Sequence, residues 1–178
     1  YLDRLQAGIA DLQGAKQFDV LSEIEANSEN IRVAWLWYVE QEQLLPLDNV
    51  CDGLGYFYRS RGRYVEGSRI IQTAIDQAEI MKHRSSLSEA ETVMFARLTI
   101  WQSLFNRDLG HLDTAEEKAH QAQLLLASLP ASEPSVQAVQ AFSWLNMGHL
   151  LRDNDRPQAQ QYYEQSLALY QDLNDQWG

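Results

Sequence analysis

The feature that most constrains the fold is a pattern of small residues that recurs around three predicted turns. Turns are expected at Gly62 and Gly110, because glycine readily takes the positive φ that ends a helix and reverses the chain. A third turn is expected within residues 153–155, where two aspartates flank an asparagine. The small residues before and after these turns fall in three matching sets: Gly55, Ser103 and Gly148; Gly67, Ala115 and Ala159; Ala74, Ala122 and Ser166. Small side chains at such positions let two helices approach closely, so the pattern predicts a series of antiparallel helix pairs.

The spacing of apolar residues predicts an all-α chain. Leu2, Leu5, Ile9 and Leu12 recur three or four residues apart, and similar helical stripes continue along the sequence. No stretch shows the sustained alternation of a half-buried strand. We therefore expect an all-α fold of about eight helices. The pairs should stack as a right-handed superhelix, an α-solenoid.

The positions of helix breakers predict how the chain is divided. A helical run is expected over residues 18–43 and should end before Pro46, which cannot continue a helix. Capping boxes are expected at Ser22 with Glu25 and at Ser86 with Glu89. The expected organisation is an N-terminal helical segment and three helix pairs: 1–45, then 47–82, 86–128 and 133–173 within 46–178.

The best-formed pair resembles a tetratricopeptide repeat. Leu54, Gly55 and Tyr58 fit the Leu-Gly-x-x-Tyr pattern of that family's first helix. The usual aromatic of the second helix is replaced by Ile71, and the leading tryptophan is present only in the last pair, as Trp144. The helices are also longer than in the usual repeat of about 34 residues. The resemblance implies a tetratricopeptide-like helical region that binds other proteins.

Three further stretches resemble the helical region of the bacterial signal-transduction ATPases called STAND regulators, including LuxR- and AfsR-like proteins. They are residues 23–37, 61–67 and 166–178, the best motifs of a resemblance that covers most of the chain. Asn174 stands where that family has a glycine, and Trp177-Gly178 resembles the start of a further repeat. The resemblance implies that a nucleotide-binding ATPase domain precedes the chain and that an effector, such as a DNA-binding domain, responds to it.

The charge of the chain argues against several classes of partner. Its net charge is −11, whereas binding to nucleic acid or to an anionic membrane surface requires a basic surface. No apolar run reaches the length of about 18 residues that a membrane span needs. Cys51 is the single cysteine, so no disulfide can form within the chain. This favours a reducing compartment, and we expect a cytoplasmic location.

Residues of catalytic chemistry are not grouped in any recognisable pattern. The sequence lacks a phosphate-binding loop, a nucleophile elbow and a His-Glu-x-x-His motif. His149 and Asp153 are four residues apart, but a solvated helix end explains them better than a metal site does. We expect no enzyme activity, catalytic residue, cofactor or metal in these residues.

The repeat register predicts two columns of side chains on the concave face of the array. The first contains one bulky residue from each pair, and the second contains one arginine from each: Tyr56, Leu104 and His149; Arg59, Arg107 and Arg152. Such a groove would bind an acidic peptide or another carboxylate through paired hydrogen bonds. The alternative is that each arginine pairs locally with Asp52, Asp108 or Asp153 and caps its helix.

The sequence thus predicts a non-catalytic protein-interaction or sensor module of a STAND-type regulator, which binds a protein, a peptide or a small ligand. Two alternatives stay open at this point. The chain could be a constitutive scaffold in a tetratricopeptide protein without an ATPase. It could also be the non-catalytic repeat region of a larger kinase or cyclase.

Overall fold

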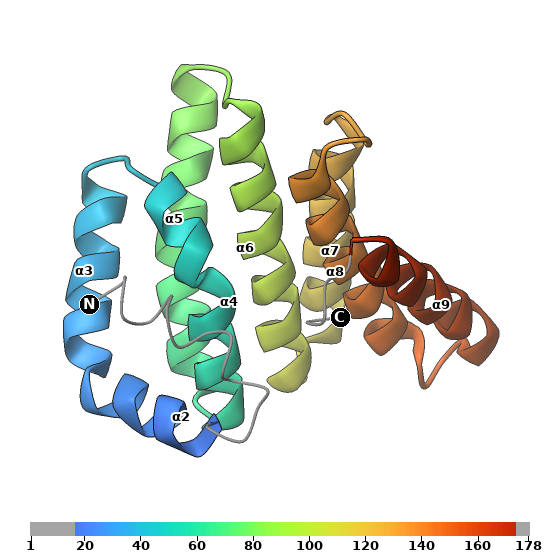
Figure 1. Cartoon of the computed structure of the whole chain (residues 1–178), viewed down its shortest axis with the longest axis horizontal. Helices are drawn as coiled ribbons and strands as arrows, with labels where there is room; N and C mark the ends of the chain where they lie inside the picture. Colours follow the sequence, from blue (N-terminus) through green and yellow to red (C-terminus); the bar gives the residue numbers. More distant parts are fainter. Residues whose placement is uncertain (1–16, 174–178) are drawn as a thin grey trace. The chain divides into compact units, whose positions relative to one another are not determined.

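The computed structural model describes residues 17–173, apart from the side chain of residue 49, and the regular structure in this range is entirely helical. The predicted all-α fold is confirmed. Eight helices are described, numbered as in Figure 1: α2 (Gln17–Ala26), α3 (Ser28–Glu40), α4 (Leu45–Ser60), α5 (Tyr64–Arg84), α6 (Glu89–Asp108), α7 (Leu112–Ala127), α8 (Pro134–Leu151) and α9 (Arg156–Asp172). The helix expected over residues 1–13 and the motif expected over 174–178 lie outside the described residues.

The chain forms two compact units, Tyr1–Leu87 and Ser88–Gly178. Helices α2–α5 belong to the first unit, and α6–α9 belong to the second. The predicted division after residue 45 and into three repeat pairs stays a prediction. The helices α4 and α5, α6 and α7, and α8 and α9 are each joined by a short connection (Figure 1).

In the second unit, the pairs α6–α7 and α8–α9 pack together because α8 contacts both α6 and α7. Small residues lie at the closest approaches, as the repeat register predicts. A Cβ atom built on Gly148 would come within 2.6 Å of the Tyr163 ring, so α9 leaves no room for a side chain there. The buried Ser103 hydroxyl donates to the Ala115 carbonyl at 2.7 Å and thereby links α6 to α7. Close packing of backbone and short side chains therefore holds this unit together.

The turns that separate the paired helices follow the predicted chemistry. Gly62 and Gly110 have φ values of +66° and +81°, a left-handed conformation that costs glycine little. At the third turn, the Asp155 carboxylate accepts a hydrogen bond from the Gln158 amide at 3.1 Å and caps α9. The three predicted chain reversals are confirmed.

In the first unit, α3 packs against both helices of the α4–α5 pair. Trp35 is fully buried there, and its indole nitrogen donates to the Thr73 hydroxyl on α5 at 3.3 Å. Trp37, two residues further along α3, is 51% exposed. One face of α3 therefore anchors the first unit, while the Trp37 side of the helix is in contact with solvent.

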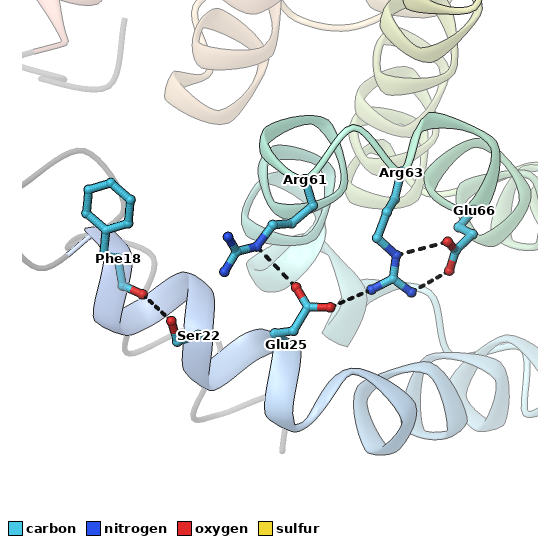
Figure 2. A network of polar contacts seen from close by, with 6 residues as sticks. All are labelled: Phe18, Ser22, Glu25, Arg61, Arg63 and Glu66. Atoms are coloured by element: carbon cyan, nitrogen blue, oxygen red, sulfur yellow. Dashed lines mark hydrogen bonds and ion pairs between the residues drawn. The ribbon is translucent and has the colours of Figure 1, made fainter.

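Three details of the sequence prediction are wrong. The run expected over residues 18–43 is broken at Asn27, whose side-chain amide donates to the Glu23 carbonyl beside its own backbone N–H. Ser22 does not begin a capping box, because it lies inside α2 and its hydroxyl donates to the Phe18 carbonyl at 2.7 Å (Figure 2). The second capping box is two residues later than expected, at Ser88 with Glu91 rather than at Ser86.

Candidate interaction site

The six residues of the predicted columns belong to both units of the chain. Tyr56 and Arg59 lie on α4 in the first unit, where both side chains are half-buried. The other four belong to the second unit: Leu104 and Arg107 on α6, His149 on α8, and Arg152 at the C-terminal end of α8.

Two of the three arginines contact the aspartate that follows them. The Arg107 guanidinium lies 2.8 Å from the Asp108 carboxylate, and the Arg107 side chain is only 20% exposed. Arg152 lies 3.3 Å from the Asp153 carboxylate but is 64% exposed. The hydrogen bond to Asp153 raises the pKa of Arg152. Local pairing is therefore present at both sites, and Arg152 presents much more of its side chain to solvent than Arg107 does.

The bulky residues of the other column differ in accessibility. Leu104 is 3% exposed and contributes to the core. Tyr56 and His149 are half-buried, and each makes a hydrogen bond to another helix of its own unit. The Gln17 amide of α2 donates to the Tyr56 hydroxyl at 2.6 Å, and the Tyr163 hydroxyl of α9 lies 3.1 Å from Nδ1 of His149. The three bulky residues therefore do not form one solvent-exposed column, because Leu104 is buried.

A surface hollow of about 360 Å³ lies where α8 turns into α9. It is lined by Arg152, Asp153, Arg156, Ala159, Gln160 and Tyr163. Two guanidinium groups and one aromatic ring are suited to an acidic side chain or a terminal carboxylate. Of the six predicted residues, Arg152 lines this hollow, and His149 is linked to it only through its contact with Tyr163. The hollow also includes Arg156, which the repeat register alone does not indicate.

A second cluster of charges lies in the first unit, where α2 meets the α4–α5 turn. Figure 2 shows the Glu25 carboxylate of α2 between two arginines of that turn. Its oxygens lie 3.1 Å from Nε of Arg61 and 3.0 Å from Nη1 of Arg63. The partners are more than thirty residues apart in sequence, so helical spacing gave no signal for this contact.

Arg63 is the most constrained residue of this cluster. Its guanidinium donates two hydrogen bonds to the carboxylate of Glu66, a residue in the first turn of α5. The same guanidinium lies over the rings of Phe57 and Tyr58, 5.8 and 5.5 Å from their centroids. The bonding to Glu66 raises the pKa of Arg63 and lowers the pKa of Glu66. Burial raises the pKa of Tyr58, while the nearby Arg63 charge opposes that effect. Arg63 is therefore fixed in orientation before it meets Glu25.

The part of the chain that the structure describes contains neither a metal site nor a membrane-spanning helix. Among residues 17–173, no group of three histidine, cysteine, aspartate or glutamate side chains is arranged to hold a metal ion. No helix within the same range combines the length and the apolar character that crossing a membrane demands.

Comparison with known proteins gives one match. A family model described as "Tetratricopeptide repeat" matches residues 143–176, a segment that contains the C-terminal part of α8 and all of α9. Neither the curated proteins nor the solved structures gave a match. The match coincides with the pair in which Gly148 meets Tyr163. The chain therefore contains a tetratricopeptide-like helical region, and such a repeat indicates a protein–protein interaction module.

Proposed function

We propose that the chain is the non-catalytic interaction and sensor region of a cytoplasmic STAND-type regulator. The observation that carries the proposal is the tetratricopeptide match over α8 and α9, in a chain whose described part is helical throughout. The sequence resemblance at residues 23–37, 61–67 and 166–178 supports the regulator context. The partner is a protein, a peptide or a small ligand, and its binding changes how the repeat region lies against an ATPase domain.

The proposed partner surface includes the hollow at the α8–α9 turn. Arg152 and Arg156 supply positive charge there, in a chain of net charge −11, and Tyr163 supplies an aromatic wall. An acidic peptide suits this combination, because its carboxylates accept paired hydrogen bonds from guanidinium groups. Arg59 and Arg107 are the equivalent arginines of the earlier pairs, and the proposal includes them. We expect Arg107 to contribute less to partner binding than Arg152 does, because Arg107 is largely buried beside Asp108.

Binding of acidic peptides tests the surface. We expect Arg152→Ala to weaken the binding of a glutamate-rich peptide about tenfold, as expected for the loss of one charge-assisted pair. The matched control is Arg84→Ala, because Arg84 is also exposed and ion-paired but lies in the first unit. Equal affinities for the parent chain, Arg152→Ala and the Arg59/Arg107/Arg152 triple alanine variant would remove the surface from the proposal.

The encoded sequence upstream of residue 1 tests the regulator context separately. A phosphate-binding loop followed by a winged-helix domain is the expected result. A kinase or cyclase domain there, or no nucleotide-binding domain at all, would overturn the regulator assignment and leave an interaction module of another protein class.

A further inference from the structure

Helix α2 and the α4–α5 turn carry opposite charges. The ten residues of α2 include three acids, Asp19, Glu23 and Glu25, and no base. Residues 59–63 include three arginines, although the chain has only 14 basic residues in all. Both segments belong to the first unit, and the contacts between them are therefore a property of that unit alone.

Two arginines of the turn form a receptor for one carboxylate. Arg61 and Arg63 reach different oxygens of Glu25, so the carboxylate is held from two sides (Figure 2). Charge-assisted hydrogen bonds of this kind fix orientation as well as adding energy. The orientation of Arg63 is set by Glu66 and by the rings of α4, and these contacts do not involve α2. The Arg63 side of the receptor is therefore pre-organised by the α4–α5 pair.

Helix α2, which supplies Glu25 to this receptor, has few buried side chains. Among the ten residues of α2, only Leu21 and Ile24 are buried. A helix of this length is marginal in water by itself, since isolated helices shorter than about 12–15 residues are rarely stable. The helix also ends at Asn27, where the backbone leaves the helical conformation (φ −109°, ψ 8°) before α3 begins. Displacement of α2 thus need not disturb α3, which has its own anchor in Trp35.

We propose that the Arg61–Arg63 receptor is a binding site for an acidic helical segment of a partner protein, and that α2 occupies it as an internal ligand. The partner segment binds by displacing α2. Displacement also removes the Gln17 amide from the Tyr56 hydroxyl and so exposes a residue predicted to contact a partner. This inference rests on the proposed interaction function and adds a regulated site to it.

The internal ligand specifies what the partner must present. Glu25 supplies the carboxylate, and Ile24 beside it and Leu21 one turn earlier supply the apolar contact. Gln17 supplies an amide donor about two turns before the carboxylate. A competing segment therefore needs an amphipathic helical pattern with a glutamate or aspartate next to its apolar face. A free inorganic anion would satisfy the arginines but not the apolar contact.

The test uses the whole chain and a peptide of residues 17–26, acetylated at its N-terminus and amidated at its C-terminus. Nuclear magnetic resonance signals of the Arg61 and Arg63 Nε–H groups report occupation of the receptor directly. In the Glu25→Gln chain the internal carboxylate is lost, and we expect the peptide to bind about threefold to tenfold more tightly than it binds the parent chain. A peptide carrying the same Glu25→Gln change should not shift the arginine signals.

Glu42→Gln is the matched control chain. Glu42 also forms an ion pair between residues distant in sequence in the first unit, and its partner is Arg84 of α5. This control should bind the peptide as the parent chain does. Equal peptide affinity in the parent and Glu25→Gln chains would overturn the proposal, and so would an equal gain in the Glu42→Gln chain. Amide hydrogen exchange provides the second measurement, because residues 17–26 should exchange faster in Glu25→Gln alone.

Failure of this inference can be distinguished from failure of the proposed function. The peptide comes from the chain itself, so its binding does not require the natural partner or an upstream ATPase. Loss of the regulator assignment would leave the peptide result unchanged. Conversely, an unchanged peptide affinity would remove the displacement of α2 while leaving the hollow at the α8–α9 turn as a partner surface.

Discussion

The contact of α9 with α8 and the contact of α2 with the α4–α5 turn are made in different ways. Between α8 and α9, Gly148 admits the Tyr163 ring against the backbone, and the buried Ser166 hydroxyl donates to the Ala141 carbonyl at 2.8 Å. Between α2 and the turn, Glu25 forms ion pairs with Arg61 and Arg63, and all three side chains are partly exposed. Packing of the first kind is rigid and insensitive to salt, whereas exposed ion pairs contribute little and are screened.

The largest expected effect comes from filling the space at Gly148. The change Gly148→Leu should lower the free energy of unfolding of the second unit by about 3 kcal/mol, because overpacking a closed contact forces side chains and backbone apart. Chemical denaturation checks this value. Adding Tyr163→Ala should recover part of the loss, so strictly additive effects of the two changes would contradict the assigned contact.

A smaller loss is expected when the polar link between α6 and its neighbours is cut. The Ser103 hydroxyl donates to Ala115 and accepts from the Asn146 side-chain amide at 2.8 Å. The change Ser103→Ala leaves that buried amide without this partner and should cost about 1–3 kcal/mol in denaturation experiments. The control is Ser128→Ala, at an exposed helix end, which should stay within about 0.5 kcal/mol. Equal losses for the two variants would contradict the account.

These two contacts also indicate how far the sequence predicts the fold. Ser103 and Gly148 occupy equivalent places in successive pairs, as Ala115 and Ala159 do, and a fixed spacing reveals such places without a structure. The turns at Gly62 and Gly110 are predictable for the same reason, because their chemistry is local. Local signals nevertheless predicted the positions of the capping boxes poorly, because more than one serine near the start of α6 has a glutamate three residues later.

The candidate site was less predictable than the fold. The repeat register indicated Arg152 but not its neighbour Arg156, which lies on the next helix and shares the same hollow. The register also placed Leu104 in a binding column, although its side chain belongs to the core. The pairing of Glu25 with Arg61 and Arg63 depends on the break at Asn27 between α2 and α3, and no periodic pattern in the sequence predicts that break.

The ion pairs of α2 should give a modest effect on stability. A double-mutant cycle of Glu25→Gln and Arg61→Gln should give a coupling free energy of about 0.2–1 kcal/mol at low salt, in the range of exposed pairs. The coupling should fall as salt is added. A cycle of the same design on Glu42 and Arg84 provides the comparison. A Glu25–Arg61 coupling that is independent of salt would contradict an exposed electrostatic contact.

The smallest effect is a pH dependence at Glu66. The hydrogen bonds from Arg63 lower the pKa of Glu66 below its ordinary value of 4.5. Because the folded-state pKa lies below the unfolded value, this contribution to stability is fully present above about pH 4.5 and is lost as the pH falls through the folded value. Carbon-13 titration of the Glu66 carboxyl group checks the direction. In the Arg63→Gln variant the pKa should return toward 4.5.

Amide hydrogen exchange at two salt concentrations tests the contrast between the two regions most directly. Raising the salt from about 0.05 M to about 1 M shortens the screening length several-fold. Exchange of residues 17–26 should then accelerate, while the amides of α8 and α9 keep their protection. Equal acceleration in both regions, or none in α2, would contradict the claim that charge contributes to the docking of α2 while close packing alone holds α9.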